Sequence, residues 1–457
     1  MKSKKSIINL VTSLIIVFLC FCVGYSHAGV LITEQHLTYQ GAFRVPYPNL
    51  GGDSSASRTM GRGGAAPVFN PANNSLIMMT GENQHIELSI PDLVISDTIT
   101  GLNSATVIQA PMRIVTNWSA LGLDGASVTN GGRPGDNLLY NNRLIGSAWA
   151  YYSTSNYLSH YSASPTWSTS GSQFSGLKGL GETPGGSIPG HNFVGGFMAL
   201  VPDEWQTQLG YPAITGQGAI SIISRSSSGP AAYGFNPDDV GINDPAVGEW
   251  FIVYPDNHST LGNYSSAEPS LYFNRATYVD GVVFPVGSDN ILFFGTHGLG
   301  MSGEGDSCYG FGTSDISLHL EPYPEGGVYC YDPVKSSKGG HAYPYVYQVW
   351  VYDANDLLAV KNGTIEAWDV VPYARWELDL PFATGTKTIK GVAYDPSTQR
   401  IFVVQAGADN TASQYTPYPI VHVYSLDLAA APQAEPVVEP APQSTPIPEP
   451  PPVLRLQ

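Results

Sequence analysis

Short apolar runs closed by turn residues recur along this chain, and few of its apolar stretches have helical spacing. Runs such as Leu76–Met79 and Ile401–Val404 are rich in Val, Ile, Met and Phe and end at Gly, Asn, Asp or Pro. Runs of this length and composition are typical of β-strands. The pattern therefore predicts an all-β protein.

The runs follow a repeated order. Near the start, Ala65–Pro71 is followed by a turn and then by Leu76–Gly81 and Ile86–Asp92. A matching set recurs near the end of the chain, at Gly391–Pro396, Ile401–Val404 and Ile420–Tyr424. Four strands in about 53 residues have the size of a propeller blade.

We therefore predict a single β-propeller between Leu37 and Leu428, with seven four-stranded blades of about 56 residues each. One strand from one terminus is expected to complete the blade that the other terminus begins, because this closes the ring without an open sheet edge. Three long, Gly-rich and Ser-rich insertions interrupt the repeat, at Ser153–Gly196, Tyr211–Asn243 and Gly298–Tyr345. Blades need only short turns, so these loops are candidate functional segments.

The two ends of the chain differ from the propeller region. Residues 1–28 read as a secretory signal, with a lysine-rich start, an apolar run and a Ser-x-Ala site before the expected mature start. An uncleaved membrane anchor is the alternative for this segment. Residues 29–429 form the predicted propeller domain, and residues 430–457, with nine prolines, form a disordered tail or a spacer. The mature protein is thus expected to have no membrane span and to be secreted, periplasmic or held at the cell surface.

The charge of the chain excludes one class of partner. The formal net charge is −17, and three of the 20 basic residues fall in the predicted leader, which leaves 17 against 37 acidic residues. Nucleic-acid binding needs clustered Lys and Arg, so nucleic-acid partners are not expected. With 27 tyrosines and 50 glycines, the surface instead suits polysaccharide or other glycan ligands. The sequence says nothing decisive about the oligomeric state.

Two cysteines outside the leader each have a histidine eleven residues to the outer side. The quartet is His297, Cys308, Cys330 and His341. Two thiolates and two imidazoles satisfy tetrahedral Zn²⁺, and a closed site of this kind is structural. The alternative is a Cys308–Cys330 disulfide, which would contribute about 3 kcal/mol by closing a loop of about 20 residues.

Candidate catalytic groups come from the first two insertions and the loops beside them. Histidine, tyrosine and arginine together suit β-elimination from a uronic-acid polysaccharide, since arginine neutralises the carboxylate and histidine or tyrosine moves the protons. The candidates are His191, Arg225, Tyr264, His160 and Tyr211.

With these residues and the quartet, the chain resembles the secreted, seven-bladed polysaccharide lyases of the ulvan-lyase type. The resemblance implies a structural zinc held by the quartet. It also implies a His, Tyr and Arg active centre on the propeller face, for which His191, Tyr264 and Arg225 are the nearest matches.

Other functions stay open. A glycosidase needs two facing carboxylates, and the acids near the insertions have no recognisable pairing. A calcium site at Asp353–Asp356 competes with an ordinary helix start there. The main alternative to a lyase is an extracellular propeller that binds glycans or proteins without catalysis.

Overall fold

The computed structural model describes residues 30–429, with gaps at 48–49, 51–58, 62, 119–131, 151–157, 169, 172–173, 183–190, 218–226, 228, 244, 256, 264–269, 301–306, 336, 338, 383 and 412. The predicted leader and the Pro-rich tail lie outside the described residues. None of the helices in the described part is long and apolar enough to cross a membrane.

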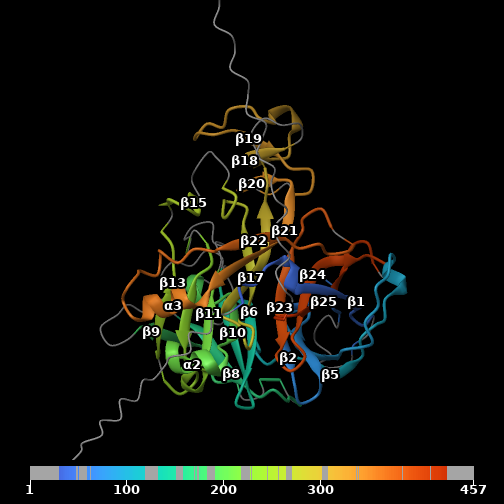
Figure 1. Ribbon diagram of the computed structural model, residues 1–457. Coiled ribbons are helices and arrows are strands. Elements are labelled where there is room, and N and C mark those ends of the chain that lie inside the picture. The colour runs from blue at the N-terminus through green and yellow to red at the C-terminus, as the bar shows by residue number, and fades with distance from the viewer. Residues whose placement is uncertain are drawn as a thin grey trace, which may run out of the picture.

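Sets of four hydrogen-bonded strands account for most of the described strands, and two of these sets join through their outer strands into one eight-stranded sheet (Figure 1). Four of them use strands in the order in which they follow along the chain, although some of the connections between paired strands are long. They are β2 (Ala65–Asn70), β3 (Ser75–Met79), β4 (His85–Ser89) and β5 (Val107–Met112); β6 (Arg133–Tyr140), β7 (Arg143–Trp149), β8 (Leu158–Ala163) and β9 (Lys178–Glu182); β10 (Phe197–Leu200), β11 (Ala213–Gly216), β12 (Ala232–Phe235) and β13 (Ala246–Ile252); β16 (Tyr278–Val283), β17 (Asn290–Gly298), β21 (Tyr345–Asp353) and β22 (Ala374–Glu377). The outer strands β9 and β13 also pair with each other in parallel.

A fifth sheet joins the two ends of the described chain. Its order is β1–β25–β24–β23, with β1 (Leu37–Arg44), β25 (Tyr418–Leu426), β24 (Arg400–Asp409) and β23 (Ile389–Asp395). Strand β1 runs antiparallel to β25, with Leu37 opposite Leu426. The expected closure by a terminal strand is therefore confirmed.

The first strands of the five sheets form a ring. We call β2, β6, β10, β16 and β23 the inner strands; each contacts the next, and β23 contacts β2. A separate cluster of buried apolar side chains fills each of the five spaces between neighbouring sheets, such as Phe197 with Phe293 and Met78 with Phe402. A closed ring of four-stranded sheets is a β-propeller.

The prediction of seven blades is wrong, because the described residues form five. The prediction of seven rests on an equal blade length of about 56 residues. In the structure, long connections between strands take up much of the chain, so fewer blades form. The fourth sheet alone extends from Tyr278 to Glu377, because the third predicted insertion lies between its strands β17 and β21.

That insertion forms a small sheet of its own. It consists of β18 (Cys308–Thr313), β19 (Tyr329–Tyr331) and β20 (Gly340–Tyr343), and we call it the projecting sheet because it extends beyond the disc of blades (Figure 1). Backbone hydrogen bonds from Leu299 to Pro344 (2.7 Å) and from Gly300 to Ala342 (3.0 Å) join its base to the end of β17. The smaller elements are α1 (His191–Val194), α2 (Asp203–Leu209), α3 (Ala354–Lys361), β14 (Asn257–His258) and β15 (Gly262–Asn263).

Inner strands carry an irregularity near their start. The pairing register shifts between Val279 and Gly281 in β16 and between Ile389 and Val392 in β23. Gly391 has φ +125°, and a Cβ there would lie 2.4 Å from Cδ of Pro67 on β2. A residue with a side chain would both strain the backbone and clash with the neighbouring blade.

The alternation of strand directions gives the disc two different faces. We call the end where the inner strands begin the loop face; the connection that holds the projecting sheet is on it. The opposite end, where the inner strands finish, is the turn face; it carries short turns such as Pro71–Asn74 and helix α2. In Figure 1 the loop face points towards the projecting sheet, and α2 lies at the opposite end.

Candidate functional site

A polar pocket of about 380 Å³ lies on the loop face, at the base of the projecting sheet. Blade four contributes the start of β16, the end of β17 and the start of β21; blade five contributes the segment before β23, and the insertion contributes one lysine. We define the polar pocket by its lining residues, which are Tyr278, Asp280, Thr296, Lys335, Tyr345, Thr386 and Thr388. Hydroxyl groups, one ammonium and one carboxyl thus face one space.

Lys335 and Tyr278 are paired in this pocket. The Lys335 Nζ atom donates to the Tyr278 hydroxyl oxygen at 3.3 Å and lies 4.8 Å from the centre of the Tyr278 ring. An ammonium in this position is attracted by the face of the ring and can still bind an anion. The pair places a cation and a phenol next to each other.

Asp280 and Lys390 occupy matching positions in neighbouring inner strands, each just before the glycine of the strand irregularity. Burial raises the pKa of Asp280 to about 7, and the Lys390 charge opposes part of that rise. Burial likewise lowers the pKa of Lys390, and the Asp280 charge opposes the fall. A carboxyl with a pKa near neutrality is suited to accept or release a proton.

Asp332 holds the wall of the pocket in place. Its Oδ1 atom accepts the backbone N–H groups of Val334 (2.9 Å) and Lys335 (3.0 Å), and its Oδ2 atom accepts from Tyr345 Oη (2.7 Å) and His341 Nδ1 (2.8 Å). Burial opposes ionisation of Asp332, but these hydrogen bonds outweigh it and lower its pKa. One buried carboxylate thereby fixes both Lys335 and Tyr345.

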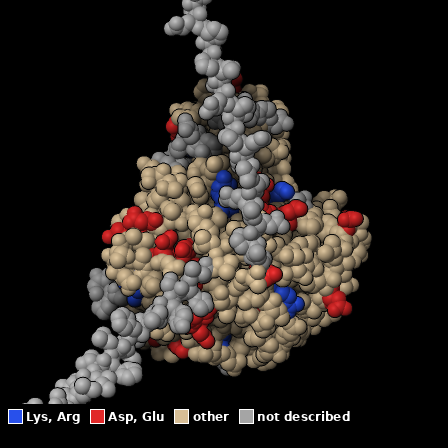
Figure 2. Space-filling view, in the orientation of Figure 1, with Lys and Arg blue, Asp and Glu red and all other residues tan. Residues whose placement is uncertain are grey.

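The surface around the pocket is basic for an acidic protein. Lys335 lines it, Lys390 is near enough to Asp280 to lower the pKa of that carboxyl, and the Lys387 ammonium lies 5.3 Å from the centre of the Tyr347 ring. Figure 2 shows basic atoms just below the upper projection and acidic atoms spread over much of the visible face. The pocket is therefore a local exception to a net charge of −17.

The predicted zinc quartet does not assemble. Cys308 and Cys330 form a disulfide within the projecting sheet, which removes both thiolates as ligands. His297 hydrogen-bonds to Thr277 through Nδ1 (2.8 Å), and both ring nitrogens of His341 contact oxygens, of Asp332 and Ser337. Among the described residues no group of three or more His, Cys, Asp or Glu side chains is arranged to hold a metal ion. The alternative reading, the disulfide, is the correct one.

His160, a predicted catalytic residue, is fully buried. Its Nδ1 atom bonds to Ser159 Oγ (2.8 Å) and its Nε2 atom to Thr215 Oγ1 (3.1 Å), and its ring contacts Phe235. Burial lowers the pKa of His160 to about 3. Both nitrogens are used inside the blade interface, so the ring does not reach a substrate in this structure.

Tyr211 lies on the opposite side of the disc. It follows α2 in the connection from β10 to β11, on the turn face, where its ring packs against Phe251 and under the Lys361 ammonium. Burial, with the nearby Glu249, raises the pKa of Tyr211 to about 12. His160 and Tyr211 therefore do not share a cleft.

The remaining candidates lie outside the described side chains. His191 begins α1, but its side chain is not described; Arg225 and Tyr264 fall in gaps of the described chain. The described strands on either side of these three residues end and begin on the loop face. Their catalytic role stays a prediction.

None of the residues that line the polar pocket is among the candidates predicted from the sequence. A signal was present, because Val279-Asp280-Gly281-Val282 and Ile389-Lys390-Gly391-Val392 are matching segments of two inner strands with a charge before the glycine. A charge in an otherwise apolar inner strand is unusual, since such a group is costly to bury. Lys335 carries no such signal, because only the fold of the insertion brings it there.

No protein-family model and no curated protein matches the sequence. Among solved structures, the chain is similar to one described as the Dos1 propeller, with 9% identity and a TM-score of 0.27 over 79% of this chain and 68% of that chain. It is also similar to a "putative hydrolase" from Bacteroides ovatus ATCC 8483, with 11% identity and a TM-score of 0.31 over 80% of this chain and 87% of that chain. Similarity this distant carries no argument about activity. The class of protein defined by the strand topology is a closed β-propeller with an inserted sheet.

Proposed function

We propose that this protein is an exported carbohydrate-active propeller that binds a uronic-acid-containing polysaccharide at the polar pocket and cleaves it by β-elimination. The observation that carries the proposal is the presence of an ammonium, a phenol and a partly desolvated carboxyl around one space of about 380 Å³. A pocket of this size accommodates a sugar residue.

Lys335 would bind the carboxylate of the uronic acid. An ammonium beside that carboxylate stabilises the negative charge that develops when the neighbouring C5 proton leaves. The pairing of Lys335 with Tyr278 supports this role, because the phenol holds the ammonium at the pocket without neutralising it.

Asp280 and Tyr278 would move the protons. The ionised Asp280 carboxylate removes the C5 proton, and the electron pair of that C–H bond forms the C4–C5 double bond as the bond from C4 to the glycosidic oxygen breaks. The Tyr278 hydroxyl donates its proton to the leaving oxygen. Solvent then returns the proton from Asp280 and reprotonates Tyr278, so the step needs no metal, oxidant or nucleophile.

The sequence candidates His191, Arg225 and Tyr264 stay part of the proposal. A polymer bound at the pocket would extend over the loop face, from which the connections that contain these residues start. Alanine at Arg225 or His191 is expected to abolish turnover and to leave the fold intact; loss of folding would instead assign these residues to the structure.

The test is a panel of uronate-containing polysaccharides incubated with the purified protein. Elimination creates a conjugated, unsaturated product, so ultraviolet absorbance reports it without knowledge of the exact polymer. Lys335→Met should lower kcat/KM by at least about tenfold, whereas Lys335→Arg should retain part of the activity. Lys361→Met, which removes the same charge on the turn face, is the control.

No absorbance change with any polymer would refute elimination. The second candidate function is then glycan binding without catalysis, which the hydroxyl groups of Thr296, Thr386 and Thr388 favour because they bind sugars by hydrogen bonds alone. Calorimetric titration with the same polymers would detect it, and Lys335→Met should weaken that binding too.

A further inference from the structure

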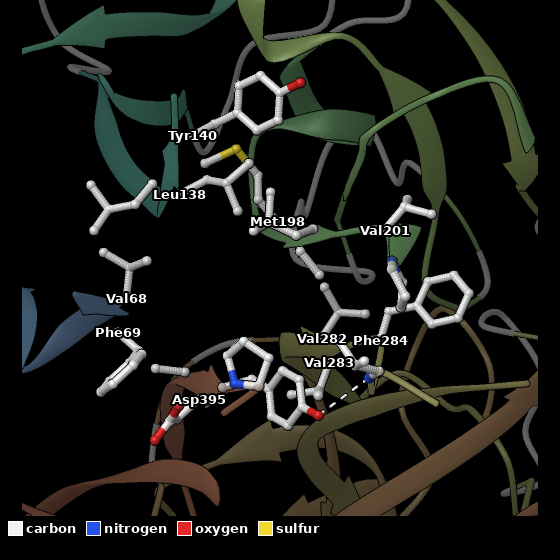
Figure 3. Close-up of a pocket in the computed structure, with 18 of the residues that line it drawn as sticks. Val68, Phe69, Leu138, Tyr140, Met198, Val201, Val282, Val283, Phe284 and Asp395 are labelled. Atoms are coloured by element: carbon white, nitrogen blue, oxygen red, sulfur yellow. Dashed lines mark hydrogen bonds between the residues drawn. The ribbon is translucent and has the colours of Figure 1, made fainter. Parts of the chain in front are cut away.

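A second cavity lies at the centre of the turn face, at the other end of the inner strands from the polar pocket. Its volume is about 490 Å³, in the range of sites for small organic ligands. All five inner strands contribute apolar residues to its lining, among them Val68, Leu138, Met198, Val282 and Val392. We call this space the axial cavity; Figure 3 shows Val68, Leu138, Met198 and Val282 around it.

The walls extend this apolar surface towards the opening. Phe69, Val201 and Phe284 lie around the same space, from three different blades. Phe284 is itself supported by Trp205 of α2, whose ring centre is 6.1 Å away. The axial cavity is thus a preformed apolar space on rigid strands, which favours binding of an apolar group with little ordering cost.

Two carboxylates at the start of α2 give one side of the opening a negative charge. Asp203 accepts from its own helix, through Gln206 Nε2 (3.0 Å), and Glu204 accepts the backbone N–H of Gly287 (2.6 Å). In the described part of the chain neither forms an ion pair with Lys or Arg. Asp395 differs, because it pairs with Arg400 at 3.1 Å.

The lining of the axial cavity contains no basic residue, and the rings of its two tyrosines can attract a cation. Tyr140 and Tyr394 lie at the rim. Burial raises the pKa of Tyr394, and the carboxylates of Asp395 and Glu204 raise it further, as expected where the local potential is negative. Aromatic rings beside carboxylates are a recurrent setting for organic ammonium groups.

We propose that the axial cavity binds an amphipathic organic cation, with its apolar body between the inner strands and its ammonium group against Asp203, Glu204 and the tyrosine rim. A neutral apolar molecule would leave the carboxylates unused, and an anion would be repelled by them. This site is separate from the polar pocket and does not depend on the function proposed for it.

Calorimetric titration at low ionic strength with three probes of equal chain length tests the proposal. The probes are octyltrimethylammonium, octanol and octylsulfonate, each below its micelle concentration. We expect one site per chain, with the cation bound at least about tenfold more tightly than octanol and octylsulfonate bound most weakly. Added salt should weaken only the cation.

Substitutions separate the two parts of the site. The double variant Asp203→Asn with Glu204→Gln should bind the cation and octanol about equally, because only the charge is removed. Met198→Trp should fill the cavity and abolish binding of all three probes, and Val282→Phe is a milder filling variant should that protein fail to fold. Glu325→Gln, an exposed acid on the insertion, is the charge control.

Equal affinity for the three probes in the unaltered protein would overturn the proposal. Cation binding that survives in the folded Met198→Trp or Val282→Phe variant would overturn it as well, because the ligand would then bind elsewhere on the acidic surface. If Glu325→Gln weakens cation binding as much as the double variant does, the cation is attracted by the acidic surface in general, and the proposal is overturned as well.

Discussion

The Tyr345 hydroxyl donates a hydrogen bond of 2.7 Å to Asp332 Oδ2, and this bond ties the first residue of propeller strand β21 to the segment that follows the projecting sheet's β19. The same carboxylate accepts the backbone N–H of Lys335. Asp332 therefore couples the insertion to the blade at the point where the polar pocket forms.

Replacing Asp332 should disturb both partners at once. In Asp332→Ala, Tyr345 and the loop of Lys335 lose their shared acceptor, so we expect ligand affinity at the polar pocket to fall about tenfold and stability to fall by about 1–3 kcal/mol. Chemical denaturation and calorimetric titration measure the two effects.

Tyr345→Phe is the matched variant, since it removes one hydrogen bond but leaves the loop of Lys335 fixed. It should weaken binding less than Asp332→Ala does. Equal binding by Asp332→Ala and the unaltered protein would mean that the loop position does not depend on this carboxylate.

The disulfide gives a prediction that distinguishes it from zinc. Protein purified without chelator and denatured without reductant should contain no titratable thiol from Cys308 or Cys330 and no stoichiometric zinc. Replacing both cysteines by alanine should cost about 3 kcal/mol, because the 22-residue separation is no longer closed in the unfolded chain. Two free thiols with one zinc ion per chain would contradict the disulfide.

The pKa of Asp280 sets a pH dependence for the proposed elimination. Since the ionised carboxylate is the base, kcat/KM should rise as pH increases through about 7. Lys390→Met removes the charge that lowers this pKa, so the rising limb should move to higher pH. A pH–rate profile of both proteins measures the shift.

Asp280→Asn should abolish the reaction at every pH while the protein still binds the polymer. Activity that persists in this variant would assign proton removal to another group. If the rising part of the pH–rate profile is unchanged in Lys390→Met, Asp280 and Lys390 do not interact in solution.

Four buried histidines give the fold its own pH dependence. Burial lowers the pKa of His85 to about 4 and those of His160, His297 and His422 to about 3. As pH falls below about 6.5, the unfolded chain binds protons that the folded chain does not. Each histidine then removes about 1.4 kcal/mol of stability per pH unit, until its folded pKa is reached.

Two desolvated carboxyls, the buried Asp136 and the half-buried Asp280, act in the opposite direction. Burial raises the pKa of Asp136 to about 8 and that of Asp280 to about 7, so their contribution to stability falls as pH rises above about 4. With four histidines against two carboxyls, the free energy of unfolding should still decrease from pH of about 6.5 to about 4.5.

His422→Gln tests this account, because His422 bonds to Gln405 and to Tyr39 of the closing strand β1. In this variant, the slope of the free energy of unfolding against pH should decrease by about 1.4 kcal/mol per pH unit, which corresponds to one proton. Tyr39→Phe removes a bond and keeps the histidine, so it should lower stability without changing the slope. An unchanged slope in His422→Gln would show that this histidine is protonated in the fold.

The strands could be predicted from the sequence, because the apolar runs and the turn residues that end them depend only on neighbouring residues. Ala65–Pro71 and Gly391–Pro396 were recognised as matching strands, and both are inner strands. The blade number was not readable, because it depends on how much chain lies between strands. No local signal distinguishes the long connection from β17 to β21 from a further blade.

Residue types that suit a chemistry were easier to find in the sequence than residues that share a pocket. His160 has a suitable side chain but lies inside the interface between blades two and three, with both nitrogens bonded. Lys335 and Asp280 are 55 positions apart, and they line one pocket only because the insertion folds back over the start of β16.

The sequence by itself determined an all-β chain, a ring closed by a terminal strand and a pair of cysteines outside the predicted leader, because each of these follows from periodicity, repetition or residue count. The tertiary structure decided the number of blades, the bonding of the cysteines and the residues that line the polar pocket and the axial cavity. Those depend on which side chains converge from five inner strands, and that convergence is a property of the closed ring rather than of any single segment.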